Sequence, residues 1–272
     1  MASYSFVSKM CYGVAGCCLA GSVFYTIKQD DLAMRETSEA KNVWKWNSNW
    51  DKREPHCLMK PKKRSKQRED EKLCTLTATA TRHILLIRHG QYDTKAPSDK
   101  EMKLTYLGRE QAQLVGKRLK DLNISYDKLI RSTLIRAIET SDIIHKFILD
   151  VPLETSELLE EGCPIPNEPP SGSFRYEYES FQDGARIEAA FRKYFHRADP
   201  GQKSDSYEII VCHANVIRYF VCRLLQVPPE AWLRFSLHHC SITWTTIFPN
   251  GNVAVKSYGD AGFLPADKMT RS

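Results

Sequence analysis

Paired cysteines are missing from this chain. Its nine cysteines form no Cys-x-x-Cys pair, and their number is odd. This pattern excludes the usual structural zinc sites and the small disulfide-rich scaffolds. We therefore interpret the cysteines as reduced thiols, several of them in the protein core.

Excess positive charge is missing from the larger part of the chain. Residues 83–272 contain 24 Lys and Arg against 24 Asp and Glu, whereas residues 1–82 contain 15 against 9. The net charge of +6 therefore belongs to the first segment. This balance argues against a nucleic-acid partner, and any affinity for anions must come from a local cluster of cations.

Charge is also absent from residues 10–27. As a helix this stretch would extend ~27 Å, just enough to cross the hydrocarbon core of a membrane. We therefore predict an N-terminal membrane anchor or targeting segment over residues 1–28. The alternative is a cleaved secretory signal with Leu19-Ala20-Gly21 as the cleavage site, although the unpaired cysteines argue against secretion.

Residues 29–82 are charged and lack apolar periodicity, which is typical of a linker. Residues 44–51 carry three tryptophans within this polar sequence, and such aromatic anchors are typical of a docking segment. The alternative is a strap packed on its own domain. The basic run at residues 60–68 is compatible with nuclear localisation, with a contact to anionic lipid, or with a merely solvated linker.

The most informative stretch is Ile84-Leu85-Leu86-Ile87, followed by Arg88-His89-Gly90. Four branched apolar residues in a row predict a buried strand of a parallel sheet. Ligands bind at the carboxyl ends of such strands. A strand that ends in Arg88 and His89 therefore places a guanidinium and an imidazole at a candidate ligand site.

Two further strands are predicted, each followed by a helix. The strand at residues 128–131 leads into a helix that we expect Ser132 to cap and that carries Arg136 in its first turn. The strand at residues 207–212 is followed by His213 and by a helix that extends to about Leu225. The remaining expected elements are a helix after Thr105, a loop over 152–178, a helix over 186–196, and a hairpin formed by 241–248 and 253–258. This alternation predicts an α/β three-layer sandwich with a mostly parallel central sheet.

If these strands are neighbours, two guanidiniums and two imidazoles meet at one sheet edge. Such a cluster suits a phosphoryl dianion, because Arg binds phosphate oxygens with two parallel hydrogen bonds. We expect His89 to attack phosphorus and form a phosphohistidine. A carboxylic acid must then protonate the leaving alkoxide, and Glu160 or Glu161 is the candidate, with Glu161 favoured by the neighbouring Gly162.

A metal site is the competing interpretation of two histidines. No third ligand stands at metal-binding spacing with His89 or His213, so we expect no metal and no cofactor. His238-His239 precedes the predicted hairpin and is a weaker candidate for lining the pocket.

Together, the segments that begin at Leu86, Leu104, Ser132 and Val211 resemble the histidine phosphatase superfamily, whose founding members are the phosphoglycerate mutases. The motifs are Leu-Ile-Arg-His-Gly-Gln, Leu-Thr-x-x-Gly-Arg-Glu-Gln-Ala, Ser-x-x-x-Arg-Ala-Ile-Glu-Thr and Val-Cys-His-Ala-Asn. The resemblance covers residues 82–272 and implies a phosphoglycerate-mutase-like fold over a histidine phosphatase domain at 83–272. It implies His89 as nucleophile, Glu161 as acid, and Arg88, Arg136 and His213 as phosphate ligands.

Within the superfamily the chain is similar to a branch of mitochondrial serine/threonine protein phosphatases. That similarity rests on Asp183-Gly-Ala-Arg-Ile-Glu-Ala-Ala-Phe, His196-Arg-Ala-Asp and Pro265-Ala-Asp-Lys-Met-Thr-Arg-Ser. It implies a mitochondrial membrane anchor and self-assembly into multimers through a tryptophan motif, here Trp46, Asn49, Trp50 and Asp51. The chain departs from the branch at Asn47, where an acid is usual, and at His238-His239-Cys240, where an Asn-rich loop is usual.

The function predicted from the sequence is a metal-independent protein phosphatase that hydrolyses phosphoserine or phosphothreonine, with phosphohistidine as a further candidate substrate. One alternative is a small-molecule phosphatase or mutase. The other is a catalytically weak multimeric scaffold at a mitochondrial membrane.

Overall fold

A computed structural model describes residues 45–59, 66–171 and 177–271. The chain divides into two compact units, Met1–Asn47 and Ser48–Ser272. The predicted membrane anchor and residues 60–65 of the basic run lie outside the described residues. In the described part of the chain, no helix combines the length and the apolar character that crossing a membrane requires.

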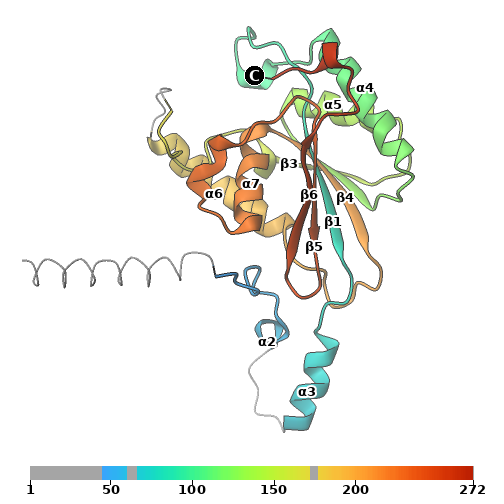
Figure 1. Cartoon of the computed structure of the whole chain (residues 1–272), viewed down its shortest axis with the longest axis vertical. Coiled ribbons are helices and arrows are strands. Elements are labelled where there is room, and N and C mark those ends of the chain that lie inside the picture. The colour runs from blue at the N-terminus through green and yellow to red at the C-terminus, as the bar shows by residue number, and fades with distance from the viewer. Residues whose placement is uncertain (1–44, 60–65, 172–176, 272) are drawn as a thin grey trace, which may run out of the picture. The chain divides into compact units, whose positions relative to one another are not determined.

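The second unit is built on one six-stranded sheet, which Figure 1 shows nearly edge-on. Its strand order is β3-β2-β4-β1-β5-β6, and every strand runs in the same direction except β5. The strands are β1 (Arg82–Arg88), β2 (Lys128–Ser132), β3 (Leu153–Ser156), β4 (Ser206–Cys212), β5 (Ile242–Ile247) and β6 (Val253–Asp260). The predicted, mostly parallel sheet is confirmed.

Helices cover both faces of the sheet (Figure 1). On one face are α4 (Tyr106–Asp121) and α5 (Ile135–His145), and on the other are α6 (Glu177–Tyr194) and α7 (Ala214–Leu225). Alternate residues of β1 serve the two layers: Ile84 and Leu86 join the α6 and α7 cluster, whereas Leu85 and Ile87 join the α4 and α5 cluster. Successive side chains of a strand point to opposite faces, so the apolar run completes both cores of the expected sandwich.

Shorter helices occupy the connections between these elements. They are α2 (Pro55–Leu58), α3 (Lys66–Thr75) and the 3₁₀ turns η1 (Asp99–Glu101), η2 (Glu157–Leu159), η3 (Pro229–Arg234) and η4 (Ala266–Lys268).

The two helix N-caps predicted from the sequence, Thr105 and Ser132, have different outcomes. Thr105 caps α4 as predicted, since its hydroxyl accepts a hydrogen bond from the Gly108 amide at 3.0 Å. Ser132, by contrast, does not cap α5, because the N-cap position is Leu134 and Ser132 still belongs to β2. The prediction of Ser132 as the cap was therefore wrong.

The expected loop over residues 152–178 contains regular structure. It includes β3, η2 and the first residues of α6. Strand β3 pairs only with β2 at the edge of the sheet and buries one of its four residues. It carries little apolar pattern because its backbone pairing, rather than its side chains, holds it in place.

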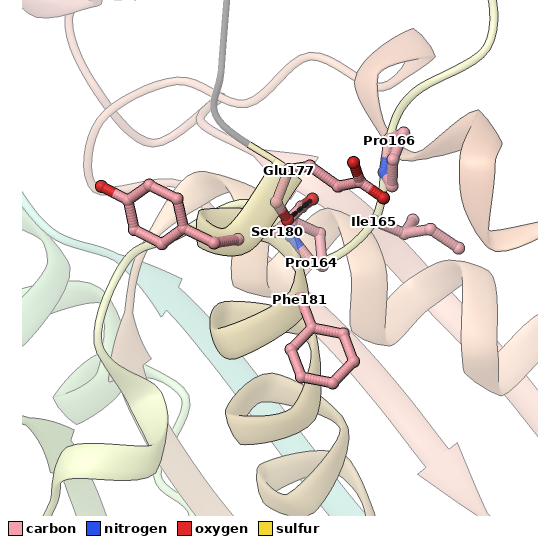
Figure 2. A pocket seen from close by; sticks show the side chains of 7 residues that line it. Pro164, Ile165, Pro166, Glu177, Ser180 and Phe181 are labelled. Carbon is pink, nitrogen blue, oxygen red and sulfur yellow. Dashed lines mark hydrogen bonds between the residues drawn. The ribbon is translucent and has the colours of Figure 1, made fainter.

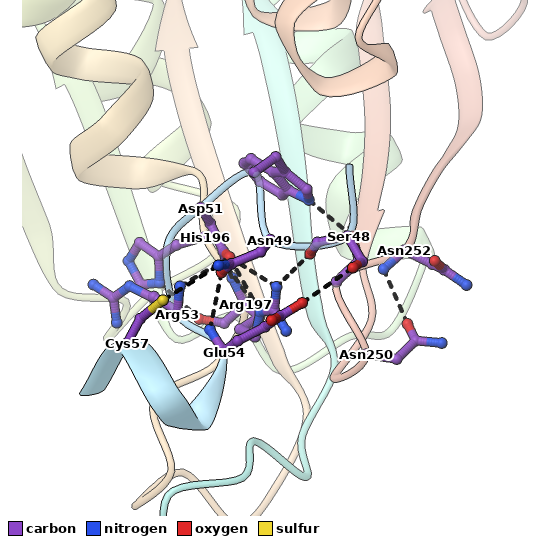
Figure 3. Close-up of polar contacts among 12 residues, drawn as sticks. Ser48, Asn49, Asp51, Arg53, Glu54, Cys57, His196, Arg197, Asn250 and Asn252 are labelled. Atoms are coloured by element: carbon purple, nitrogen blue, oxygen red, sulfur yellow. Dashed lines mark hydrogen bonds and ion pairs between the residues drawn. The ribbon is translucent and has the colours of Figure 1, made fainter. Parts of the chain in front are cut away.

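Residues 48–57, called the strap below, pack on the same compact unit as the sheet (Figure 3). Asp51 accepts hydrogen bonds from the Arg197 backbone at 2.8 Å and from its guanidinium Nε at 3.0 Å and Nη2 at 2.8 Å. The Trp50 indole N–H donates to the Gly251 carbonyl at 2.8 Å. The compact unit therefore begins at Ser48 rather than at the expected His83.

The other residues of the tryptophan motif differ in their surroundings. Asn49 shapes the strap itself, because its side-chain oxygen accepts from the Glu54 amide at 3.2 Å and its amide donates to the Cys57 sulfur at 3.2 Å. Trp46 precedes the compact unit and is 36% exposed. The strap therefore packs on the domain of its own chain, which is the alternative to a docking segment that the sequence left open for residues 44–51.

Candidate active site

The ends of neighbouring parallel strands carry the candidate residues. Arg88 ends β1 and His89 follows it, His213 follows β4, and Arg136 lies in the first turn of α5 after β2. All four residues are at most 2% exposed. Because β2, β4 and β1 are adjacent in the sheet, the structure brings together the four groups that the sequence predicts at one edge.

His89 is held in a defined orientation. Its Nδ1 lies 2.8 Å from the Gly90 carbonyl oxygen. A carbonyl only accepts, so Nδ1 carries the proton and Nε2 keeps a lone pair. Burial lowers the pKa of His89 well below its usual value, and the nearby His213, Arg88 and Arg136 lower it further. The imidazole is therefore neutral and nucleophilic at neutral pH.

The imidazole of His213 lies next to that of His89, with ring centroids 5.0 Å apart. Its Nε2 is 2.8 Å from the Ser132 hydroxyl, which explains why Ser132 is buried at the end of β2 rather than capping α5. Its Nδ1 is buried and has no hydrogen-bond partner among the described residues. Burial, followed by Arg136 and Arg88, lowers the pKa of His213.

The two guanidiniums are anchored by groups that only partly offset their charge. Arg136 forms an ion pair of 3.0 Å with Asp99, whose side chain is 55% exposed, and stacks over the Tyr92 ring at 4.9 Å. Arg88 donates to the Leu237 carbonyl at 2.8 Å, and burial lowers its pKa to about 10. The site therefore has a surplus of buried positive charge, which is suited to a dianion.

Of the two candidate acids, Glu161 faces the cations. Its carboxylate accepts from the Gly162 amide at 3.1 Å and from the Asn215 amide at 3.5 Å, beside His213. Burial raises the pKa of Glu161, although the Gly162 amide, Arg136 and Arg88 oppose that effect. The Glu160 carboxylate instead accepts a hydrogen bond from the Thr133 hydroxyl. Of these two carboxyls, Glu161 is therefore the one that lies beside the predicted nucleophile and phosphate ligands.

Two aromatic side chains complete the surroundings of His89. The Tyr92 ring stands perpendicular to it at 4.9 Å, and the His239 ring lies 5.8 Å away. Tyr92 is not predicted by the motifs above; its position three residues after His89 is the signal that could have identified it. His239, a weak candidate in the sequence, is 3% exposed and lies at the site.

A separate pocket of about 540 Å³ is lined by residues 164–166 and by the first turns of α6 (Figure 2). Its lining is mostly apolar: Pro164, Ile165, Pro166, Glu177, Tyr178, Ser180 and Phe181. None of these residues belongs to the cationic cluster. Within the described ranges, no three His, Cys, Asp or Glu side chains gather in a way that could hold a metal ion.

The geometry defines a class of protein. Two buried histidines and two buried arginines at the carboxyl edge of an α/β sheet agree with the family model described as histidine phosphatase superfamily (branch 1), which matches residues 84–163 and 166–260. The chain belongs to this superfamily.

Individual proteins within and near this superfamily are also similar to the chain. The chain is 52% identical over 232 residues to the rat (Rattus norvegicus) protein named serine/threonine-protein phosphatase PGAM5, mitochondrial, and the match covers 84% of this chain and 81% of the relative. Phosphoglycerate mutase of Plasmodium falciparum is 35% identical, with 66% of this chain and 92% of that chain covered and a TM-score of 0.49. The α-ribazole phosphatase of Shigella flexneri shares the fold at 20% identity, with a TM-score of 0.50 over 65% of this chain and 96% of that chain.

Proposed function

We propose that this protein is a metal-independent phosphoprotein phosphatase that hydrolyses phosphoserine and phosphothreonine through a phosphohistidine at His89, with phosphohistidine as a further substrate. The observation that carries the proposal is the orientation of His89. Its Nδ1 is bound to the Gly90 carbonyl, so the Nε2 lone pair is free among buried cations.

In the first step, His89 Nε2 attacks phosphorus, the N–P bond forms, and the bond from phosphorus to the serine or threonine oxygen breaks. Arg88, Arg136 and His213 stabilise the charge that builds on the phosphoryl oxygens. Glu161 transfers its proton to the departing alkoxide, for which its raised pKa is suited.

In the second step, water attacks the phosphohistidine. The Glu161 carboxylate takes a proton from this water, the N–P bond breaks, and inorganic phosphate leaves while His89 returns to its neutral form. Each residue thereby ends the cycle as it began, and this chemistry uses no metal and no cofactor.

The choice of a phosphoprotein as substrate rests on the relatives. The rat protein and its counterparts in other animals carry the name serine/threonine-protein phosphatase, at about half identity over more than four-fifths of this chain. The same names support a mitochondrial location, and the uncharged residues 10–27 support a single N-terminal anchor in a mitochondrial membrane.

The test is release of inorganic phosphate from phosphoserine and phosphothreonine peptides. We expect His89→Ala to abolish turnover and to prevent trapping of labelled phosphoenzyme, which in the wild type should map to His89. The matched control is His145→Ala, which removes another imidazole of the same domain, one whose hydrogen bond is to the Val151 carbonyl at 2.7 Å, and which should keep wild-type turnover. Unchanged turnover in His89→Ala would eliminate this mechanism.

We also propose that Trp46, Asn49, Trp50 and Asp51 mediate self-association. Trp46 offers an exposed aromatic anchor. The site that Trp50 and Asp51 occupy on their own domain is equally suited to the strap of a second copy, as in domain swapping. Sedimentation of the wild type against Trp50→Ala, with activity measured on the same samples, tests this. An unchanged multimer would contradict the proposal.

A further inference from the structure

His239 is a third imidazole at the phosphate site, and the mechanism above gives it no role. It lies between η3 and β5, with its ring 5.8 Å from that of His89 and 6.0 Å from that of Tyr92. The next residue fixes its position, because the Cys240 amide donates to the Arg88 carbonyl at 3.1 Å and to the His89 carbonyl at 3.3 Å. The segment that carries His239 is therefore tied to the backbone of the nucleophile through the Cys240 amide.

One nitrogen of His239 is occupied by the C-terminal segment. Nδ1 lies 2.9 Å from the Thr270 hydroxyl, and the His239 amide donates to the Thr270 carbonyl at 3.0 Å. The other nitrogen, Nε2, is buried and has no hydrogen-bond partner among the residues that the structure describes. A buried polar nitrogen without a partner is costly, and a bound ligand would satisfy it.

The hydrogen bonds of Gln111 indicate which nitrogen of His239 carries the proton. Gln111 is fully buried, and its side-chain oxygen accepts from the Gln91 amide at 2.8 Å. Its Nε2 is therefore the donor, to the Lys268 carbonyl at 2.7 Å and to the Thr270 hydroxyl at 2.9 Å. The Thr270 hydroxyl, having accepted from Gln111, is free to donate its own proton to His239 Nδ1, and Nε2 then carries the ring proton.

We propose that His239 Nε2–H is a fourth ligand of the phosphoryl group beside Arg88, Arg136 and His213, a neutral donor that binds an oxygen of the substrate phosphate and of the phosphohistidine. The separation of the two rings is short enough for a phosphoryl oxygen on His89 to accept a hydrogen bond from His239. The C-terminal segment thereby acts on the site through Thr270, which fixes the orientation of the ring.

This inference rests on the proposed function. Two roles of the His239 side chain must be distinguished, a structural one and a phosphate-binding one. A merely structural His239 needs Nδ1, which contacts Thr270, whereas a phosphate ligand needs Nε2. Asparagine and glutamine imitate these two positions: the amide of Asn reaches the place of Nδ1, and that of Gln reaches the place of Nε2. The pair His239→Asn and His239→Gln therefore distinguishes the roles.

The experiment measures inhibition of the full-length protein by inorganic phosphate, with a phosphothreonine peptide as the substrate. We expect His239→Asn to weaken phosphate inhibition about tenfold, the effect of one hydrogen bond to a charged acceptor. We expect His239→Gln to stay within about threefold of the wild type, because it keeps a donor at the Nε2 position. Thermal unfolding of both variants checks that the fold is retained.

Three outcomes would overturn the proposal: wild-type affinity for phosphate in both variants, equal loss in both, or loss in His239→Gln alone. The third would show that the ring only holds the C-terminal segment. The His89→Ala variant, measured in parallel, separates this inference from the proposed function. If His89→Ala is inactive while both His239 variants bind phosphate normally, the phosphatase mechanism stands and only the role of His239 fails.

Discussion

Two buried arginines in this protein have opposite surroundings. Arg197 in the strap contact is 5% exposed, and its partner Asp51 has a fully buried side chain that accepts several hydrogen bonds from it. Arg136 in the cationic cluster is 1% exposed, but the side chain of its partner Asp99 is 55% exposed. The first charge is neutralised inside the protein, and the second is not.

This difference in how the two arginine charges are balanced distinguishes an arginine that stabilises the fold from one that is available to a ligand. A buried ion pair with all its hydrogen bonds made is complete and binds nothing further. A buried cation whose ion-pair partner is exposed is suited to a negatively charged ligand, and together with burial, which is the larger cause, it lowers the pKa values of His89 and His213. We therefore expect substitution of Arg136 to affect activity, and substitution of Arg197 to affect stability.

The largest expected effect is on activity. Replacing Arg136 with Met should lower kcat/KM for a phosphothreonine peptide by about a thousandfold, because a charge-assisted contact to the phosphoryl oxygens is lost. The free energy of unfolding should change by less than about 1 kcal/mol, since Asp99 remains solvated. Steady-state kinetics and urea denaturation measure the two quantities. A large loss of stability with little loss of activity would reverse the comparison.

The strap should respond in the opposite way. Arg197→Met leaves the Asp51 carboxylate buried and unpaired, so the free energy of unfolding should fall by about 3 kcal/mol in urea denaturation. Arg53→Met is the matched control, because its partner Asp199 is 69% exposed, and it should lower the free energy of unfolding by less than about 1 kcal/mol. Equal effects of the two variants would show that the burial of the Asp51 pair does not matter.

Substitution of Glu161, the proposed proton donor, should have a smaller and more selective effect on activity. Glu161→Gln should slow formation of the labelled phosphoenzyme about 100-fold with a phosphoserine peptide, but less than about tenfold with an aryl phosphate, whose leaving group needs no proton. The alkaline decline in the rate of this step should also disappear, because the wild-type acid has a raised pKa and loses its proton as the pH rises. Equal slowing of this step with both substrates would assign Glu161 to phosphate binding instead.

The smallest expected effect depends on pH. Burial acts to raise the pKa of Asp51, but the hydrogen bonds of Arg197 outweigh it and lower the pKa below 3.8. An acid whose pKa is lowered by folding stabilises the protein above its unfolded pKa, and the contribution is lost as the pH falls through the folded pKa. Wild type and Asp51→Asn should therefore differ by about 1 to 2 kcal/mol at neutral pH, and the gap should close in acid. A constant gap from neutral to acidic pH would refute this.

The sequence was most informative where neighbouring residues act together. The apolar run before Arg88 predicts β1, Thr105 predicts the start of α4, and Asn250-Gly251 predicts the β5–β6 hairpin, because each signal is contained within a few residues. Strand β3 escaped prediction because its pairing with β2 depends on a segment distant in the chain. Ser132 was misassigned for the same reason, since its hydroxyl contacts His213, 81 residues away.

The sequence by itself determined the α/β alternation, the cations and imidazoles that follow the strands, and membership of the histidine phosphatase superfamily. Each of these can be recognised from the residue types within a short segment of the chain. Only the tertiary structure decided that Glu161 rather than Glu160 faces the cations, that the strap packs on Arg197, and that the His239 ring lies near His89 with its Nδ1 at the Thr270 hydroxyl. These contacts depend on long-range packing and desolvation, which no local pattern of residue types records.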